Sequence, residues 1–509
     1  MMQRPFNITS LFFGRAQEAP ERIAIIDGHQ QVTFGELADQ VDRTAQYFLS
    51  KGIRKGDNVL VFIPMSVDLY RIVLALFRIG AVAVFVDEWV SLKRLELCCD
   101  IAQCRAVIGG WKVRLLSLVS ATIRRIPVHL GKGFRKHVTV RAIPETGTAD
   151  TALITFTTGS TGTPKAAKRT HGFLRHQFDA LEAELGIAAG ETGIIALPIV
   201  LFLSLGLGCT AVIATFNPKK KRKMDTARIV SQLGQYKADM LIGSPFFIQQ
   251  LAAYVSARNM EMPYPGKVVT GGAPVFPREA RQYIKAFPQA RIKIVYGSTE
   301  AEPISSIEAS GLLRFEAASF TEGLNVGRPA PVAEVLIIPY KDEPLEAAAD
   351  DVLYGWSLPP GTIGEIIVAG PHVLDAYYNN PDALLRNKIF TREQCWHRTG
   401  DSGFMKDGHL YLTGRCSTLI PYGDTIIAPF LIENLLQSAA GVAAGTVLQG
   451  ASGPVIVAEV VRGADPVRAV QNIHSLNTGI ADVRLLPHLP RDPRHYSKID
   501  YEACKLLLQ

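Results

Sequence analysis

Short apolar runs bounded by Gly, Pro, Ser or Asp recur along the chain, and they restrict its fold more than any other feature. The runs lie at 59–62, 81–86, 194–197, 240–242, 268–269 and 292–295. Amphipathic stretches, such as Asp68 to Ile79 and Ala227 to Tyr236, lie between them. Strands of this kind alternating with helices predict an α/β fold in which helices cover both faces of a parallel sheet. Ligands in such folds gather at the carboxyl ends of the strands.

The length and charge of the chain limit the classes of protein that it can represent. With 509 residues it needs two or more domains. The net charge is +7, but five positive charges lie in the run 219–223, which leaves +2 for the rest. We therefore predict no nucleic-acid-binding surface. The run resembles a nuclear import signal; we interpret it as a solvated loop, with docking of an acidic carrier protein or a membrane surface as the open alternative.

The cysteines and the N-terminus point to a reducing compartment. The seven cysteines are odd in number and show no C-x-x-C spacing, so buried thiols are predicted rather than disulfides or a zinc site. The first sixteen residues lack the apolar core and the cleavage site of a signal peptide. A cytoplasmic protein is therefore predicted.

One segment is long enough to span a bilayer. Residues 197–216 carry no charge and precede the basic run directly. Pro198, Gly206 and Gly208 within it, and the lack of a second such segment, argue against a span. We expect at most peripheral membrane contact.

A loop rich in small and hydroxylated residues follows the apolar run Leu153 to Phe156. The loop reads Thr157, Thr158, Gly159, Ser160, Thr161, Gly162, Thr163, Pro164 and Lys165. Its glycines allow close backbone approach, its hydroxyls supply neutral donors, and its lysine adds a positive charge, which together suit a polyphosphate. The spacing is not that of a Walker A loop, and a plain linker is the alternative. An amphipathic helix from Thr170 to Leu185, with Thr170 as N-cap, is predicted next.

This loop resembles the phosphate-loop signature of the adenylate-forming superfamily, which includes acyl-CoA synthetases, peptide-synthetase adenylation domains and luciferases. The resemblance implies that Thr157 to Lys165 grips the β- and γ-phosphates of ATP, with Thr157 among the catalytic residues. It also implies that 197–216 forms a buried helix leading into a strand.

Two further motifs follow predicted strands in the order of that family. They are Gly271, Gly272, Ala273 and Pro274, and then Tyr296, Gly297, Ser298, Thr299 and Glu300. The first would let a flat base lie against the backbone, and the second offers a ring for stacking, a hydroxyl and a hard oxygen ligand for Mg²⁺. By resemblance, the first lines the adenine pocket, and the second supplies adenine stacking and the metal ligand Glu300.

Three residues near the C-terminus complete the resemblance. Asp401 suits the two hydroxyls of a ribose, and Arg415 can reach ribose or phosphate. Lys498 lies in a proline-bounded loop, where a lone lysine would ordinarily be a surface residue. The family places a lysine here on the reacting carboxylate and α-phosphate, where it stabilises the transition state. The resemblance implies a large α/β domain over 1–415 and a small mobile α+β domain over 416–509, with a hinge near Ser417.

The activity implied is an AMP-forming ligase that uses ATP and Mg²⁺ to convert a fatty carboxylic acid to acyl-AMP and pyrophosphate, then transfers the acyl group, with CoA as the favoured acceptor. An apolar lining from Phe202, Phe246 and Phe247 would be equally consistent with protein core. Arg494 to Ile499, and Leu419 to Asp424 in place of a CoA-contacting stretch, resemble the branch of β-lactone synthetases of olefin biosynthesis, in which the substrate's own hydroxyl displaces AMP. An acyl carrier protein or other pathway enzymes are candidate partners. An inactive acyl-binding or membrane-anchored protein is the alternative of another class.

Overall fold

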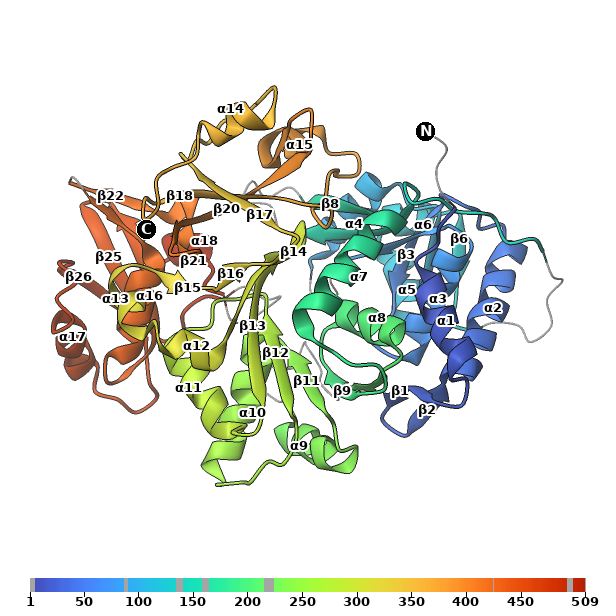
Figure 1. Ribbon diagram of the computed structural model, residues 1–509, viewed down its shortest axis with the longest axis horizontal. Coiled ribbons are helices and arrows are strands. Elements are labelled where there is room, and N and C mark those ends of the chain that lie inside the picture. Colours follow the sequence, from blue (N-terminus) through green and yellow to red (C-terminus); the bar gives the residue numbers. More distant parts are fainter. Residues whose placement is uncertain are drawn as a thin grey trace.

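The computed structural model describes residues 5–86, 90–133, 141–157, 164–214, 224–423, 425–491 and 498–508. Two mixed sheets form the larger part of the molecule, and a third, antiparallel sheet and a C-terminal segment complete it (Figure 1). The fold is therefore α/β with a large N-terminal part and a smaller C-terminal part, as the sequence predicted.

The first mixed sheet contains the strand that leads into the phosphate loop. Its order in the described ranges is β6 (Val128–Leu130), β5 (Ala106–Gly109), β3 (Asn58–Phe62), β4 (Val82–Phe85), β7 (Thr151–Thr157) and β8 (Lys165–Thr170). All neighbours are parallel except β7 and β8. The helices associated with it are α2 (Phe34–Ser50), α3 (Val67–Arg78), α4 (Leu92–Ala102), α5 (Trp111–Val119) and α6 (Ala121–Arg125).

The second mixed sheet carries the two motifs assigned to adenine and metal. Its order is β16 (Arg328–Pro329), β14 (Ala301–Glu308), β13 (Arg291–Ser298), β12 (Lys267–Gly271), β11 (Met240–Gly243), β9 (Thr192–Ile195), β10 (Thr210–Ile213), β1 (Ile23–Asp27) and β2 (Gln30–Thr33). The six strands from β13 to β1 are parallel. Its helices are α1 (Thr9–Glu18), α9 (Thr226–Gln235), α10 (Pro245–Ala257), α11 (Pro277–Ala286) and α12 (Ala309–Leu313).

Two helices lie between these sheets in Figure 1: α7 (His171–Leu185) and α8 (Pro198–Leu207). The Thr170 hydroxyl accepts a hydrogen bond from the Phe173 amide, which confirms the predicted N-cap of α7. Pro198 begins α8, and β10 follows it directly, so the apolar segment from residue 197 is a buried helix leading into a strand. Among the helices of the described ranges, none combines the length and apolar character needed to cross a bilayer.

The third sheet is antiparallel throughout. It consists of β15 (Leu324–Asn325), β21 (His409–Arg415), β20 (Cys395–Lys406), β18 (Gly364–Ala369), β17 (Glu334–Ile338) and, paired with β20, β19 (Lys388–Phe390). The associated helices are α13 (Glu316–Thr321), α14 (Asp350–Tyr354) and α15 (Pro381–Asn387). Asp401 lies within β20 and Arg415 lies at the end of β21, and these two strands are antiparallel. The rule that ligands gather at the carboxyl ends of parallel strands therefore applies to β12 and β13 but not to these two residues.

The C-terminal segment has a core of its own around Leu436, Ile456 and Ile473. It contains a small sheet of β24 (Val442–Gly450), β25 (Gly453–Val460) and β26 (Asp482–Leu486), and a hairpin of β22 (Ile420–Tyr422) and β23 (Thr425–Ile427). Its helices are α16 (Pro429–Ser438), α17 (Pro466–His474) and α18 (Tyr501–Leu506). Ser417 lies just before it, in a 3₁₀ turn from Cys416 to Thr418.

Candidate functional site

One large cleft collects the described residues that the sequence analysis assigned to a site. It has a volume of about 1660 Å³, and its lining comes from both mixed sheets, the third sheet and the C-terminal segment. The assigned residues in its lining are Thr157, Lys165, Gly271, Gly272, Ala273, Pro274, Tyr296, Gly297, Ser298, Thr299, Glu300, Asp401, Arg415 and Lys498. Thr158, Gly159, Ser160, Thr161 and Gly162 lie outside the described residues.

The two ends of the phosphate-loop candidate are fixed by strand pairing. Thr157 is paired with Lys165 across the antiparallel strands β7 and β8. The sequence analysis missed β8, because Lys165 to Thr170 is polar and lacks the apolar character of the other strands. The buried hydroxyl of Thr157 has no hydrogen-bond partner within the described part of the chain. It is therefore placed to serve a group that enters the cleft.

Lys165 is held between a neutral and a charged partner. Its ammonium donates to Oδ1 of Asn387 at 2.9 Å and lies 4.0 Å from Oε1 of Glu300. Burial lowers the pKa of Lys165, while the Glu300 carboxylate opposes that shift. The contacts with Asn387 and Glu300 thus hold the Lys165 ammonium in the lining of the cleft.

Glu300 is a buried carboxylate that remains ionised. Burial alone would raise its pKa, but neighbouring positive charge and a hydrogen bond from the Tyr377 hydroxyl at 2.9 Å lower it to about 2. Burial lowers the pKa of His397 well below its usual value, so that imidazole is neutral at pH 7 and the lasting cations are Lys165 and Lys388. An ionised carboxylate in a cleft fits one ligand of a Mg²⁺ that shares its other ligands with water and phosphate. It does not form a complete metal site, and no cluster of three metal-ligating side chains occurs among the described residues.

The sequence analysis did not find three residues that act on the Glu300 carboxylate from within the protein: Lys388, Tyr377 and His397. Lys388 is buried, donates to the carbonyl oxygen of Leu374, and has its pKa lowered to about 8, chiefly by burial. Its ammonium and that of Lys165 each lie 5.8 Å from the centre of the Tyr377 ring. A lysine at the start of a short strand and a histidine before the RTGD segment gave no sequence signal, because only tertiary packing places them beside Glu300.

Backbone geometry favours glycine at both of the positions assigned to the adenine pocket, Gly271 and Gly272. A Cβ on Gly271 would come within 2.6 Å of the carbonyl oxygen of Val295, its partner on β13. Gly272 has a φ of +87°, in the region that favours glycine. Both line the cleft, but tight packing between β12 and β13 already accounts for Gly271.

Asp401 is engaged by two side chains of the same cleft. Its Oδ1 accepts from Arg415 at 2.7 Å, and its Oδ2 accepts from the Tyr296 hydroxyl at 2.7 Å. Burial and the Asp401 charge raise the pKa of Tyr296 well above its usual value, so the phenol stays protonated. A carboxylate has about four lone-pair sites, which leaves acceptor capacity for ribose hydroxyls. The Tyr296 ring is therefore tethered to Asp401 by its hydroxyl.

Lys498 lies where the end of the chain returns to the cleft. Ile499 pairs with Arg491 in an isolated antiparallel bridge, and the Asp500 amide donates to the Pro490 carbonyl at 3.0 Å. These contacts fix the chain just before and just after residues 492–497, which lie outside the described part. Lys498 is exposed and lines the same cleft as Glu300 and Arg415.

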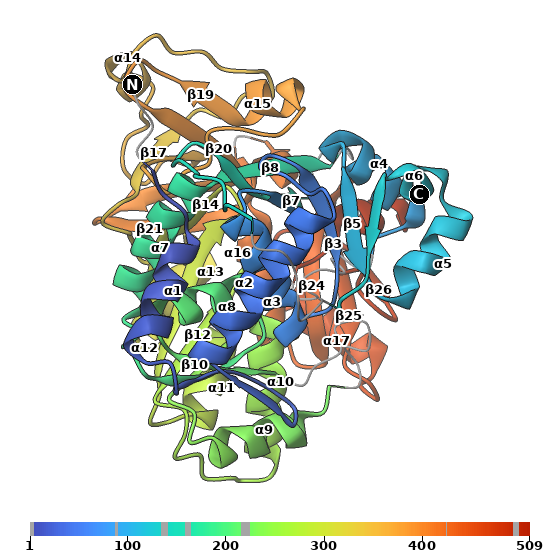
Figure 2. The same ribbon diagram turned by 90° about the vertical axis from the view of Figure 1, so that its right-hand side faces the viewer.

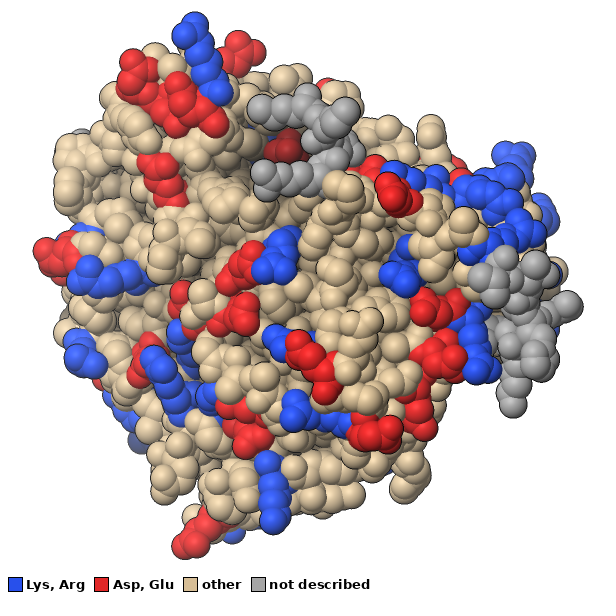
Figure 3. Space-filling model, turned by 45° about the vertical axis from the view of Figure 1, so that its right-hand side comes forward, with Lys and Arg blue, Asp and Glu red and all other residues tan. Residues whose placement is uncertain are grey.

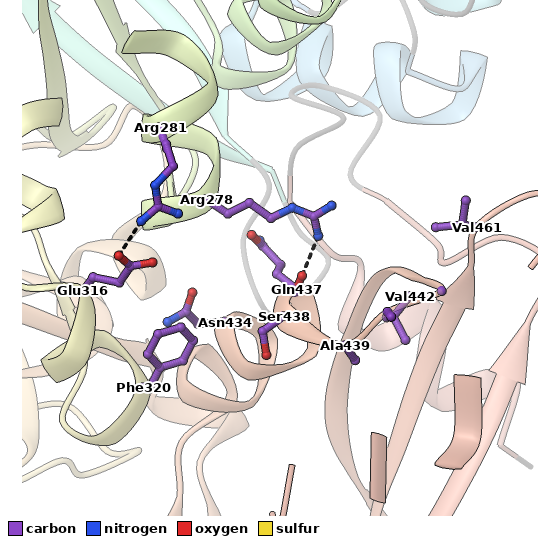
Figure 4. A pocket seen from close by; sticks show the side chains of 12 residues that line it. Arg278, Arg281, Glu316, Phe320, Asn434, Gln437, Ser438, Ala439, Val442 and Val461 are labelled. Carbon is purple, nitrogen blue, oxygen red and sulfur yellow. Dashed lines mark hydrogen bonds and ion pairs between the residues drawn. The ribbon is translucent and has the colours of Figure 1, made fainter. Parts of the chain in front are cut away.

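The C-terminal segment contacts the large part through α11 and α16. Figure 4 shows this contact around a second pocket of about 360 Å³, in which Arg278 of α11 donates to the Gln437 carbonyl at 2.5 Å and Arg281 pairs with Glu316. Asn434 of α16 donates to the Ser319 hydroxyl at 2.7 Å. Beside these polar contacts, the ring of Phe430 on α16 packs edge-on against Phe276, with centroids 6.0 Å apart.

Two carboxyl groups on opposite sides of this contact have pKa values near neutrality. Burial raises the pKa of Glu279, on α11, to about 7. Burial also raises that of Glu433, on α16, to about 7, and the charge of Glu279 adds to this effect. The Glu433 side chain accepts from the hydroxyls of Thr446 and Tyr501, and both carboxyls line the cleft.

The three phenylalanines proposed as an acyl lining all line the cleft, but they differ in burial. Phe202 and Phe246 are half-buried and line the cleft. The Phe202 ring also packs edge-on against Tyr70, with centroids 4.9 Å apart. Phe247 lines the cleft as well, but it is buried and packs in the core of the second sheet.

The sequence matches the AMP-binding enzyme family over residues 12–378. The chain belongs to that family. An olefin beta-lactone synthetase of Stenotrophomonas maltophilia is 30% identical over 98% of both chains, and a feruloyl-CoA synthase of an Amycolatopsis species is 26% identical over 85% of this chain and 84% of its own. The solved structure of O-succinylbenzoate coenzyme A synthetase (MenE) from Bacillus subtilis, in complex with ATP and magnesium, shares the fold with a TM-score of 0.78, at 22% identity over 97% of this chain and 98% of that one.

These findings identify an adenylate-forming ligase. The cleft contains cations, an ionised carboxylate, a second carboxylate with spare acceptor sites, and an apolar lining.

Proposed function

We propose that the protein activates a fatty carboxylic acid with ATP and Mg²⁺. The acid's carboxylate attacks the α-phosphorus, pyrophosphate leaves, and an acyl-AMP forms. The observation that supports this proposal most directly is the meeting of Lys165, Glu300, Asp401 and Lys498 in one cleft, although they come from four distant segments.

Each of these residues has a proposed task that follows from its charge and surroundings. Lys165 and the loop from Thr157 hold the β- and γ-phosphates, and Asp401 with Arg415 holds the ribose. Gly271 to Pro274 and Tyr296 to Thr299 form the adenine side. Glu300 would hold a Mg²⁺, which when bound neutralises phosphate charge. Lys498 stabilises charge that develops on the carboxylate and the α-phosphate, a stabilisation greatest in the transition state.

For the second step we propose that a β-hydroxyl group of the substrate displaces AMP. The hydroxyl oxygen attacks the acyl carbon, its proton is lost, AMP leaves, and a four-membered lactone closes. The support is the full-length similarity to an olefin beta-lactone synthetase. Transfer to CoA, which the sequence analysis favoured, is the second candidate, and its support is the similarity to a feruloyl-CoA synthase. Rotation of residues 416–509 about Ser417 would separate the two steps.

The test is to incubate the purified protein with ATP, Mg²⁺ and either 2-alkyl-3-hydroxy or simple fatty acids, with and without CoA. AMP release with the hydroxy acid and no CoA, together with a lactone product, is the expected result. Turnover that requires CoA and a simple fatty acid would instead establish an acyl-CoA ligase. Absence of pyrophosphate exchange with every acid would reject the proposed activation step.

A further inference from the structure

Helix α5 (Trp111–Val119) presents an apolar face to solvent. Four of its nine residues are large, apolar and more than half exposed: Trp111 by 67%, Leu115 by 52%, Leu118 by 72% and Val119 by 69%. Their spacing places them on one side of a helix. Val113, on the other side, is buried against α4 and β5. Single exposed apolar residues are common, but four on one short helix indicate a binding surface.

The surroundings of this face are strongly cationic. Between Leu92 and Arg125 the sequence has seven Lys or Arg residues and two Asp or Glu residues. That surplus of five leaves only +2 for the remainder of the chain. One of the two acids, Glu96, accepts a hydrogen bond from the Ser120 hydroxyl at 2.6 Å. Figure 3 shows Lys and Arg side chains gathered at the right-hand edge of the molecule, the end at which α4, α5 and α6 lie in Figure 2.

Helix α5 begins at the edge of the cleft. Lys112, in the first turn of α5, lines the cleft together with Phe62 and Phe85, the last residues of β3 and β4. Only Gly110 separates Trp111 from the end of β5, so α5 begins at the carboxyl edge of the same sheet. The exposed helix therefore lies beside an apolar part of the cleft lining.

We propose that α5 and the cations around it dock on an anionic lipid bilayer. The apolar face would enter the boundary between headgroups and acyl chains, with Trp111 at the interface, and the Lys and Arg side chains would contact anionic headgroups. A bilayer fits better than an acidic protein, because the apolar face lies on a helix that carries cations and packs beside the cationic helix α6, and because that helix begins next to apolar residues of the cleft lining. The docking does not depend on the proposed reaction.

Vesicle binding tests this docking without ATP or an acyl substrate. The full chain is sedimented with vesicles of phosphatidylcholine alone and with vesicles that also contain phosphatidylglycerol. We expect binding only to the anionic vesicles. Leu115→Asp with Leu118→Asp should weaken it about tenfold or more, because two exposed leucines lose their apolar contact. Arg114→Gln should weaken it about fivefold, the effect of one cation at an anionic surface.

A matched control is available on the C-terminal segment. Val467 and Leu506 are 65% and 69% exposed, so Val467→Asp with Leu506→Asp adds the same two charges away from α5 and should bind vesicles as the unmodified chain does. Unchanged thermal unfolding of the Leu115→Asp, Leu118→Asp variant would exclude misfolding as the cause of its loss. Failure of the unmodified chain to bind anionic vesicles would overturn the proposal. A dimer in solution that this variant converts to a monomer would also overturn it, and would assign the face to a second copy of the chain.

Discussion

The wall of the cleft around Glu300 and the contact between α11 and α16 use buried charge in opposite ways. Glu300 lies near Lys165 and Lys388, and positive charge around it together with the Tyr377 hydroxyl lowers its pKa below the usual value. Glu279 and Glu433 are instead two carboxyls on either side of a contact, each with a pKa of about 7. The first arrangement keeps its charge across the neutral range, whereas the second changes its charge within that range. A wall of constant charge and a contact whose charge varies with pH suit a site in which one segment is proposed to move.

The largest expected effect on activity comes from the C-terminal segment, which carries Lys498. Lys498→Ala should lower ATP–pyrophosphate exchange about a hundredfold or more, because a charge placed for the transition state is lost. The control is Lys505→Ala, which removes an exposed lysine of α18 that pairs with Glu502, and which should leave exchange unchanged. Equal rates for Lys498→Ala and the unmodified chain would remove Lys498 from the mechanism.

The next largest effect is expected on the affinity for ATP, when Asp401 in the wall of the cleft is replaced. Asp401→Ala should raise the KM for ATP about tenfold with a smaller change in kcat, because charged hydrogen bonds to the ribose are lost. Steady-state kinetics with varied ATP measures it. Asp382→Ala, in the exposed first turn of α15, is the control. If ATP affinity were the same in both variants, Asp401 would not be the ribose ligand.

A smaller effect is expected from the residues that act on Glu300 from within the protein. Tyr377→Phe removes the hydroxyl that donates to Glu300 and should cost about 1 kcal/mol of stability. Ionised Glu300 stabilises the fold above its unfolded pKa, and this contribution is lost as the pH falls toward about 2. The variant raises the pKa of Glu300, so the acid limb of its pH–activity profile should move to higher pH.

The neighbouring tyrosine supplies the control for that experiment. Tyr378→Phe removes a hydroxyl that accepts from Asn58, away from Glu300. Its acid limb should match that of the unmodified chain. A shift of the same size in both variants would mean that general destabilisation, rather than the Glu300 charge, sets the limb.

The smallest effect is the pH dependence of the α11–α16 contact. The folded pKa values of Glu279 and Glu433 lie above their usual values. Their contribution to stability is therefore fully present below the unfolded pKa and is lost as the pH rises through about 7. Glu433→Gln keeps an acceptor for Thr446 and Tyr501 and should flatten this dependence. Thermal unfolding between pH 5 and pH 8 measures it, and an unchanged slope in the variant would contradict the assignment.

The sequence was sufficient where local pattern determines structure. The strands β3, β9, β11, β12 and β13 follow from apolar runs bounded by turn residues, and α7 follows from its N-cap and amphipathic pattern. The motif residues from Thr157 to Lys498 were found because their order along the chain resembles that of a family. Their meeting in one cleft is a property of the folded chain.

The sequence was insufficient where packing gives a residue its surroundings. Lys388 has no sequence feature that separates it from a surface lysine, yet the pairing of β19 with β20 buries it beside Glu300. Glu279 and Glu433 are 154 positions apart, and only the contact of α11 with α16 relates them. The tether of Tyr296 to Asp401 is of the same kind, since its two ends belong to different sheets.

The charges of the cleft lining have a consequence for the speed at which ATP can be captured. Among the described residues, the lining contains seven Lys or Arg and seven Asp or Glu. Above pH 7, where Glu279 and Glu433 are ionised, neither sign is in surplus and the cleft exerts little long-range attraction on a polyanion. The association rate constant should therefore vary little with ionic strength, and recognition begins only when the nucleotide is within a few ångströms of Lys165 or Arg415. Below pH 7 protons on Glu279 and Glu433 tip the balance toward positive, and capture should then become faster and more easily screened.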